Sequence, residues 1–214
     1  MAEFRFDFLV IGSGIAGLNF ARKVARFGRV AIVTKRERHE SETFHAQGGI
    51  ASVLSSSDSF ELHIQDTLKA GCGLCNEKVV RLVVESGPRV IKELVDLGVP
   101  FTKVPNDKAV DNEWGYDLGK EGGHSCRRIV HAGDLTGREI EKALLKSVEA
   151  ESNVKFFEHH IAIDLITMGK FVRRTEKDIC LGAYVLDKKS GEIHTFLANA
   201  TILATGGAGK VYLI

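Results

Sequence analysis

Gly12-Ser13-Gly14-Ile15-Ala16-Gly17 is the stretch that decides the fold of this chain. An apolar run rich in strand formers, residues 6–11, precedes it, and apolar side chains at helical spacing follow it as far as Gly28. A second apolar run occupies residues 30–33. Strand, glycine-rich turn, helix and strand in this order form the context in which a GxGxxG motif binds a dinucleotide. An ordinary glycine-rich turn is the alternative interpretation.

Each glycine of this stretch has its own task in a dinucleotide site. Gly12 allows the tight turn, Gly14 lets the backbone approach a pyrophosphate, and Gly17 lets the helix pack closely on the strand. The amides at the helix start, with the positive end of the helix dipole, then receive the phosphates. We expect the other residues of the stretch, Ser13, Ile15 and Ala16, to lie at the dinucleotide as well.

The composition of the chain sets limits on its class. With 214 residues it can bury one sizeable core, or form a domain with an appendage. A net charge of +1 gives no reason to expect a nucleic acid or an acidic membrane surface as partner. No apolar run approaches the length of a membrane span, and the first residues lack the apolar segment of a signal peptide. The chain is therefore expected to be cytoplasmic.

The cysteines and histidines are not expected to bind a metal. Cys72 and Cys75 have CxxC spacing, but a zinc knuckle needs a second close pair, and Cys126 and Cys180 are far apart. Two reduced thiols in a turn between helices are the favoured interpretation. The adjacent histidines at 159–160 would point in opposite directions on a strand, which makes a shared metal improbable.

The remaining periodicity predicts an α/β fold. We expect helices from residue 60 to the glycines at 71 and 73, over 77–85, from Pro88 to Gly98, and over 139–150. We expect strands at 154–158, closed by the two histidines, and at 163–166, 180–186, 192–197 and 200–204, with a hairpin turn at 187–191. Residues 55–59 are interpreted as a polar linker, and Asp66 and Glu93 as solvated helix charges. The fold class is Rossmann-like: a parallel sheet with helices on its faces and an added β-hairpin or meander.

Two further segments have the character of a nucleotide site. Lys35 stands where most dinucleotide folds place an acidic residue for the ribose, and this keeps an NADP site possible. Ser41-Glu42-Thr43-Phe44-His45-Ala46-Gln47-Gly48-Gly49-Ile50 follows after a polar loop. Adjacent glycines behind hydrogen-bonding side chains indicate backbone lying against a flat ligand. A surface turn explains them equally well.

Together these segments resemble the succinate dehydrogenase/fumarate reductase flavoprotein family. The resemblance rests on the glycine stretch, on Lys35 and on Ser-x-Thr-x-x-Ala-Gln-Gly-Gly-Ile at 41–50. It implies FAD rather than NADP, with residues 41–49 along the cofactor and Lys35 on its ribose. Membrane-bound succinate dehydrogenases carry a flavin-linked histidine between that Ser and Thr. Here Glu42 takes the position, so non-covalent FAD is expected, released by acid precipitation.

The resemblance also assigns two later segments to FAD. In this family the backbone near Ile161 and Ala162 contacts the adenine end of the cofactor. The late run Ala204-Thr205-Gly206-Gly207-Ala208-Gly209 is typical of two-dinucleotide-fold flavoproteins, in which a strand returns to the FAD site. Thr205 and Gly206 are therefore expected at the cofactor.

A polar, glycine-rich stretch runs through residues 101–128 and on to 139, including Asp111. A loop of this length inside a compact domain is usually functional or disordered. A charged surface loop is the plain alternative. The side chains in it that can bind carboxylates or move protons are Glu121, His124, Arg127, Arg128, His131 and Asp134.

Glu-Gly-Gly-His-Ser-x-x-Arg-Ile-x-His-Ala-x-Asp-x-Thr-Gly-Arg, at 121–138, resembles the branch of the family that oxidises L-aspartate. The resemblance implies that Glu121 orients the substrate, because a carboxylate favours the α-ammonium that succinate lacks. It further implies oxidation of L-aspartate to iminosuccinate, with oxygen (giving hydrogen peroxide) or fumarate as acceptor. That reaction begins NAD biosynthesis, with quinolinate synthase as a possible partner. A soluble fumarate reductase or succinate dehydrogenase type, and a non-catalytic FAD-binding fragment, are the alternatives.

The resemblance spans residues 6–213, but members of the family are substantially longer. They continue into a capping domain and many end in a helical domain. Residues 1–214 are therefore expected to be the N-terminal portion of an FAD-binding domain without those parts. The groups that exchange the proton and grip the substrate carboxylates in this family lie in them, so no catalytic residue is assigned here. The chain alone is expected to be inactive.

Overall fold

The computed structural model describes residues 1–105, 112–171 and 178–207, which belong to two compact units. Unit 1 consists of Met1–Phe44 and Leu144–Ile214, and unit 2 consists of His45–Ala143. Within the described ranges, no helix has the length and apolar character needed to cross a membrane. The expectations for Asp111, Ala208 and Gly209 lie outside the described residues.

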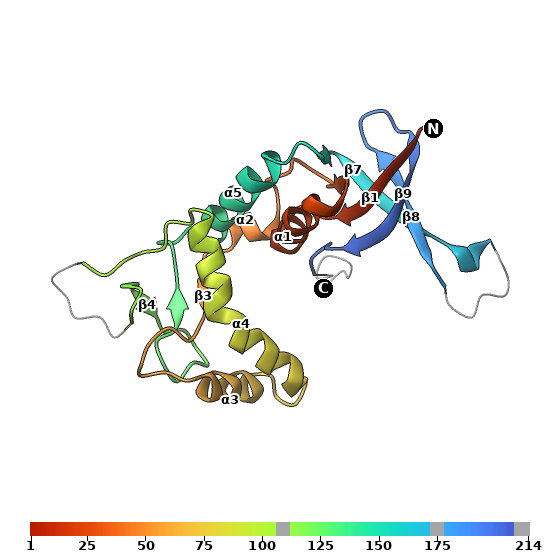
Figure 1. The fold of residues 1–214 in the computed structure, drawn as a ribbon. Coiled ribbons are helices and arrows are strands. Elements are labelled where there is room, and N and C mark those ends of the chain that lie inside the picture. Colours follow the sequence, from red (N-terminus) through yellow and green to blue (C-terminus); the bar gives the residue numbers. More distant parts are fainter. Residues whose placement is uncertain (106–111, 172–177, 208–214) are drawn as a thin grey trace. The chain divides into compact units, whose positions relative to one another are not determined.

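Unit 1 is built on a six-stranded sheet with the order β6-β2-β1-β9-β8-β7, of which Figure 1 labels β1, β9, β8 and β7. Neighbours among β6, β2, β1 and β9 run parallel, whereas β8 and β7 continue the sheet as an antiparallel meander. The expected Rossmann-like sheet with an added meander is thus confirmed. The strands are β1 Glu3–Ile11, β2 Val30–Val33, β6 Val154–Phe157, β7 His160–Thr167, β8 Cys180–Asp187 and β9 Ile193–Leu203.

The last strand returns to the first one. β9 pairs with β1 from Thr195, opposite Glu3, to Leu203, opposite Ile11, and the amide of Ala204 donates to the Ile11 carbonyl at 2.9 Å. Helix α1, Ile15–Val24, follows β1 and continues as a 3-10 turn, Ala25–Phe27. The carboxyl ends of β1, β2 and β9 therefore meet at one edge of the sheet.

One face of this sheet carries an aromatic core. Phe157 and Phe196 lie with ring centroids 4.7 Å apart in a T-shaped contact, and Phe4 packs beside both. The buried residues of this cluster are Leu9, Ile11, Ala31, Val33, Phe157, Ala183, Val185 and Phe196. They come from β1, β2, β6, β8 and β9, so burial of this face joins the parallel part of the sheet to the meander.

Unit 2 combines two packed helices with a small sheet. Helices α3, Phe60–Ala70, and α4, Glu77–Asp96, lie against each other (Figure 1). The sheet has the order β3-β5-β4, with β3 Ile50–Ala51, β5 Ile129–Val130 and β4 Leu118–Gly119. The sequence did not predict it, because two-residue strands show no alternation. The unit boundaries fall within α2, Glu42–His45, and α5, Thr136–Glu149.

The expectation of two separate helices at 77–85 and 88–98 is wrong. α4 is continuous, with Pro88 inside it. Val84 before the proline and Ile91 and Leu94 after it are all buried. Burying one unbroken apolar face outweighs the helix hydrogen bond that proline cannot form.

Two strand boundaries also differ from expectation. The runs at 192–197 and 200–204 form the single strand β9, because its central place between β8 and β1 keeps the backbone paired throughout. The histidine pair does not close β6. His159 turns the chain with a φ of +57°, and His160 opens β7. Cys72 and Cys75 do lie between α3 and α4, as expected.

Candidate functional site

Two glycines of the fingerprint are packed too closely for any side chain. Gly12 has a φ of +115°, and a Cβ there would overlap the carbonyl group of Ala204, directly after β9. A Cβ on Gly17 would overlap the carbonyl of Gly12. The turn, the helix and the returning strand therefore meet at these two positions, as expected for the tight turn and the close helix packing.

Gly14 lies in a more open place, at the start of α1. The nearest atoms to a Cβ on it would be Thr43 Oγ1 at 3.5 Å and the Ser41 Cβ at 3.9 Å. Because Gly14, the N-cap residue, has no side chain, no side-chain cap of its own covers the helix start, and the first turn of the helix, which begins with the exposed Ile15 and Ala16, carries no acidic residue. An uncrowded helix N-terminus without negative charge fits the pyrophosphate of a dinucleotide.

Thr43 joins two motifs that were predicted separately. Its Oγ1 accepts a hydrogen bond of 3.1 Å from the amide of Ile15, although 28 residues separate them. Ser41 Oγ accepts from the amide of Phe44 at 3.3 Å and so begins α2. The structure therefore places residues 41–44 against the fingerprint helix. Glu42, where covalent members of the family carry histidine, is exposed.

The residue that follows β2 holds the glycine-rich turn by a hydrogen bond. Ser13 is buried, and its hydroxyl donates to Thr34 Oγ1 at 3.0 Å. Lys35, the next residue, is exposed. Arg38 holds this loop by donating to both carboxylate oxygens of Glu158, at 3.0 and 3.1 Å. These hydrogen bonds lower the pKa of Glu158 from 4.5 to about 2.

The other residues expected at FAD are also in unit 1. Ile161 and Ala162 lie at the start of β7, and Ala162 packs against the aromatic core. Thr205 and Gly206 are exposed immediately after β9. Because β9 runs parallel to β1, these two residues and Gly12 follow the carboxyl ends of neighbouring strands. Open α/β sheets bind their ligands at that edge.

In unit 2 the structure brings together Glu121 and the second half of the 41–50 segment. A Cβ on Gly48 would come within 3.7 Å of Glu121 Oε1, the one atom within 4 Å that the described residues place there apart from those of the two neighbours in the chain. Gly49 instead packs on β5, where a Cβ would overlap the Val130 carbonyl. Close approach to a ligand is thus possible at Gly48, whereas Gly49 is needed for packing. The residues before them, His45, Ala46 and Gln47, are exposed.

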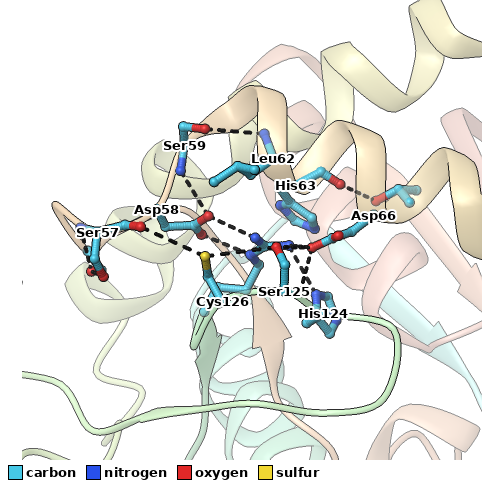
Figure 2. A network of polar contacts seen from close by, with 12 residues as sticks. Ser57, Asp58, Ser59, Leu62, His63, Asp66, His124, Ser125 and Cys126 are labelled. Atoms are coloured by element: carbon cyan, nitrogen blue, oxygen red, sulfur yellow. Dashed lines mark hydrogen bonds and ion pairs between the residues drawn. The ribbon is translucent and has the colours of Figure 1, made fainter.

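Glu121 belongs to a short loop between β4 and β5. The His124 amide donates to the Glu121 carbonyl at 3.3 Å and closes a turn in which Gly123 has a φ of +84°. Ser125 anchors the far side of the loop, because its amide and hydroxyl donate to Asp66 Oδ2 at 2.7 and 2.8 Å (Figure 2). The loop is therefore attached to α3.

Arg128 is the centre of the network of polar contacts around this loop, and Figure 2 shows its acidic partners, Asp58 and Asp66. Its side chain is 0% exposed and donates to both oxygens of Asp58, also 0% exposed, at 2.8 Å each. A third bond, of 2.7 Å, reaches Asp66 Oδ2. Burial alone would lower the pKa of Arg128, but the hydrogen bonds to Asp58 and Asp66 raise it. The guanidinium therefore remains charged in the interior.

Two histidines border this network. Nδ1 of His124 lies 3.3 Å from Arg128 Nη1 and acts as acceptor, since a guanidinium only donates. His63, buried on α3, has its ring centroid 5.7 Å from that of His124. Burial, followed by the charge of Arg128, lowers the pKa of His63. Its burial beside this cation therefore favours the neutral form of the His63 imidazole.

The structure corrects two expectations about these side chains. Asp66 is not a solvated helix charge, because it is 18% exposed and accepts from Ser125 and Arg128. Arg128 is not available to a substrate carboxylate. Asp58, in the supposed linker, was missed, because no local pattern marks a carboxylate whose partner lies 70 residues away. Of the other candidates, Arg127 and Asp134 are exposed, and His131 Nε2 lies 3.7 Å from Asp117.

Asp66 makes the network sensitive to acid. Burial alone would raise its pKa, but the bonds from Ser125 and Arg128 outweigh it and lower the pKa from 3.8 to about 2. A carboxyl with a lower pKa in the folded state stabilises the fold above the unfolded value, and that contribution disappears as the pH falls from 3.8 to about 2. A carbon-13 NMR titration should show Asp66 titrating near 2, and in Ser125→Ala closer to 3.8. A wild-type midpoint near 3.8 would contradict the network.

Comparison with known proteins identifies the family. Residues 7–213 match the family described as FAD binding domain. The chain belongs to this family. FAD, expected from the glycine fingerprint and the 41–50 segment, is thereby confirmed as the cofactor, and the alternative of NADP is set aside.

Curated relatives of this FAD-binding domain include L-aspartate oxidases. The chain is 47% identical over 207 residues to the chloroplastic L-aspartate oxidase of Oryza sativa subsp. japonica, covering 97% of this chain and 30% of that protein. It is 44% identical over 211 residues to the L-aspartate oxidase of Pseudomonas aeruginosa, covering 99% and 39%. The chain thus spans between 30 and 39% of the length of these relatives.

Solved structures resemble the domain over nearly all of its length. The E. coli quinol fumarate reductase has a TM-score of 0.86 and 28% identity, covering 99% of this chain and 34% of that one. The Mycobacterium smegmatis Sdh1 complex has a TM-score of 0.84 and 29% identity, covering 99% and 36%. The resemblance to the succinate dehydrogenase/fumarate reductase flavoproteins is confirmed.

Proposed function

We propose that this chain is the N-terminal portion of an FAD enzyme that oxidises L-aspartate to iminosuccinate. The observation that carries the proposal is the position of the Glu121 carboxylate beside Gly48, in the segment expected along the cofactor. The identities of 47% and 44% to L-aspartate oxidases support it. The acceptor is oxygen, giving hydrogen peroxide, or fumarate. This reaction supplies the precursor for NAD biosynthesis in the cytoplasm, with quinolinate synthase as the enzyme that takes up the product.

The residues of unit 1 hold the cofactor in this proposal. The amides at the start of α1 bind the pyrophosphate next to Gly14, and Lys35 donates to a ribose oxygen. Ile161 and Ala162 border the adenine end of FAD. Thr205 and Gly206, just after the returning strand β9, contact the cofactor. No histidine stands at position 42, so FAD is held without a covalent bond. When bound, FAD supplies the acceptor for the hydride that leaves the α-carbon of the substrate.

Glu121 of unit 2 selects the substrate. L-aspartate and succinate share two carboxylates and differ by the α-ammonium. A carboxylate oxygen that accepts from this ammonium stabilises L-aspartate, and it repels dicarboxylates that lack the amine. The anchoring of the loop to Asp66 through Ser125 limits how far Glu121 can move. The chain's own contribution to the reaction is therefore recognition and orientation, and the proton-transferring group is expected elsewhere.

A fumarate reductase or succinate dehydrogenase is the second candidate, because the fold matches such enzymes with TM-scores of 0.86 and 0.84. Anaerobic addition of L-aspartate, then succinate, to the full-length FAD-loaded protein separates the two. Bleaching of the oxidised flavin band by L-aspartate alone supports the proposal. Bleaching by succinate alone overturns it in favour of the second candidate, and no bleaching by either indicates a non-catalytic FAD-binding protein.

Glu121→Gln should reduce the preference for L-aspartate over succinate by about 10- to 100-fold, since a hydrogen bond to a charged group contributes roughly 1.5–3 kcal/mol. The dissociation constants of both ligands, measured from flavin spectral shifts, give this ratio. Glu61→Gln is the matched control: it is the same change in the same unit, but on an exposed ion pair with Arg81 on the surface of α3 and α4. An unchanged ratio in Glu121→Gln would refute the assigned role.

A further inference from the structure

A cluster of three metal-ligating side chains lies at the end of the meander in unit 1. His160 is at the start of β7, Asp187 at the end of β8 and His194 at the start of β9. One ligand atom of each lies within 4.8 Å of one ligand atom of each of the others. The FAD binding and substrate selection proposed above use none of these residues, so the cluster is a separate feature.

The sheet register explains why the three side chains share one face. His160 pairs directly with Asp187, and His194 pairs with Val185, two residues before Asp187 on the same strand. Successive side chains of a strand alternate between faces, so all three point to the face on which Val185 is buried. Figure 1 shows this end of the meander beside the N-terminus, and the amide of Thr195 donates to the Ala2 carbonyl at 2.9 Å.

The rings and the carboxylate are already held by neighbours. His160 Nδ1 lies 2.6 Å from the Glu158 carbonyl, which only accepts, so Nδ1 donates there and Nε2 is the nitrogen that can bind a metal. Asp187 accepts from the Lys189 amide and the Ser190 hydroxyl, both at 2.8 Å. Backbone and hydroxyl contacts of this kind orient the ligands of metal sites.

Aromatic side chains close the inner side of the cluster. The His160 ring makes an edge contact with Phe157 at 5.6 Å between centroids, and the His194 ring makes one with Phe4 at 5.8 Å. The two imidazole centroids are 6.3 Å apart. This apolar wall limits the solvation of the ligands: His194 is buried, and His160 and Asp187 are only partly exposed.

We propose that His160, Asp187 and His194 bind a divalent transition-metal ion of the zinc class. Two imidazoles and one carboxylate suit such ions, with water at the remaining position. Ligand atoms around a tetrahedral ion with bonds of about 2.0–2.2 Å are roughly 3.3–3.6 Å apart. The ligand atoms now lie within 4.8 Å of one another, so side-chain rotations that move each atom by about 1 Å bring them to these separations. The ion joins the ends of three strands, which is a structural role independent of the proposed oxidation.

Binding of the ion has one specific consequence for the chain. His194 Nδ1 accepts from the Ala2 amide at 3.1 Å. Coordination through Nδ1 displaces that amide. Coordination through Nε2 moves the ring proton to Nδ1 and breaks the same bond. The Ala2 amide therefore loses this partner in both arrangements, and its NMR signal should shift when metal is added.

Equilibrium dialysis against zinc chloride at micromolar free metal tests the site, with wild type, His160→Gln, Asp187→Asn, His194→Gln and the control His159→Asn. His159 is adjacent, but its Nε2 faces Glu37 at 3.7 Å, and asparagine tolerates its φ of +57°. We expect each ligand variant to lose one bound equivalent and the control to retain it. All variants keep the four cysteines, so zinc held by thiols cancels in the comparison.

Nitrogen-15 spectra of the wild type provide the second readout. Zinc should shift ring nitrogens of His160 and His194 and the Ala2 amide, and should raise the Tm of the wild type but not of His160→Gln. Equal zinc binding in the wild type and all three ligand variants would overturn the proposal, because the ions would then be adventitious or at thiols. Unshifted histidine nitrogens in a folded, zinc-saturated wild type would overturn it as well.

Discussion

Arg128→Met should lower the free energy of unfolding of unit 2 by about 3–5 kcal/mol. The substitution keeps an unbranched side-chain stem but removes the guanidinium, and so leaves Asp58, which is 0% exposed, without its cation. Asp66 loses a bond of 2.7 Å in the same change. An uncompensated buried carboxylate is more costly than the pair itself is stabilising, so the loss is large although the pair forms in the interior. The single tryptophan, Trp114, lies in unit 2 and reports its unfolding in urea.

Arg81→Met is the matched control for that measurement. Arg81 also contacts several carboxylates of unit 2, namely Glu61, Glu77 and Glu85, but its side chain is 41% exposed. Exposed ion pairs contribute about 0–1 kcal/mol, because water solvates the separated charges. A loss in Arg128→Met no greater than in Arg81→Met would show that the network of Figure 2 does not hold the Glu121 loop.

Gly12→Ala should destabilise unit 1 by at least about 2 kcal/mol. An alanine at a φ of +115° is strained by roughly 1–3 kcal/mol, and its Cβ overlaps the Ala204 carbonyl, which adds about 1–3 kcal/mol of overpacking. Relief of this overlap moves the end of β1 away from the residues that follow β9. Hydrogen exchange at the amide of Ala204, which donates to Ile11, should accelerate accordingly.

Gly14→Ala distinguishes packing from cofactor binding. A Cβ there meets Thr43 Oγ1 at 3.5 Å, an ordinary contact, so the stability of unit 1 should change by less than about 0.5 kcal/mol. In the proposed FAD site the same methyl group occupies the approach of the pyrophosphate, so the affinity for FAD should fall at least about tenfold, or 1.4 kcal/mol. Flavin fluorescence titration measures this. Unchanged FAD affinity in a folded Gly14→Ala protein would show that the pyrophosphate does not approach the chain at this glycine.

The network around Arg128 contains one contact that local sequence patterns can predict and one that they cannot. Ser59, the last residue of the predicted linker, caps α3 by accepting from the Leu62 amide. Its neighbour Asp58 was read as linker, although it is the buried partner of Arg128. Capping depends on residues three positions apart, whereas the ion pair joins residues 70 apart. Only the folded chain brings them together.

The small sheet of unit 2 and helix α4 show the same limit. Strands of two residues carry no periodic signal, so the pairing of Val130 with Ile50 and with Leu118 appears only in the structure. Pro88 locally favours the start of a new helix, yet the buried positions on both sides of it keep α4 continuous. Tertiary burial outweighed the local preference in this case.

By itself the sequence determined the parallel core of unit 1, the tight turn at Gly12, the close helix packing at Gly17, and the FAD family. These depend on short apolar runs and on glycines whose backbone requirements are local. Only the tertiary structure decided that Thr43 meets the fingerprint helix, that Glu121 lies beside Gly48 and that Arg128 is buried between carboxylates. The physical reason is that burial and charge pairing depend on distance in space, which local patterns in the chain do not encode.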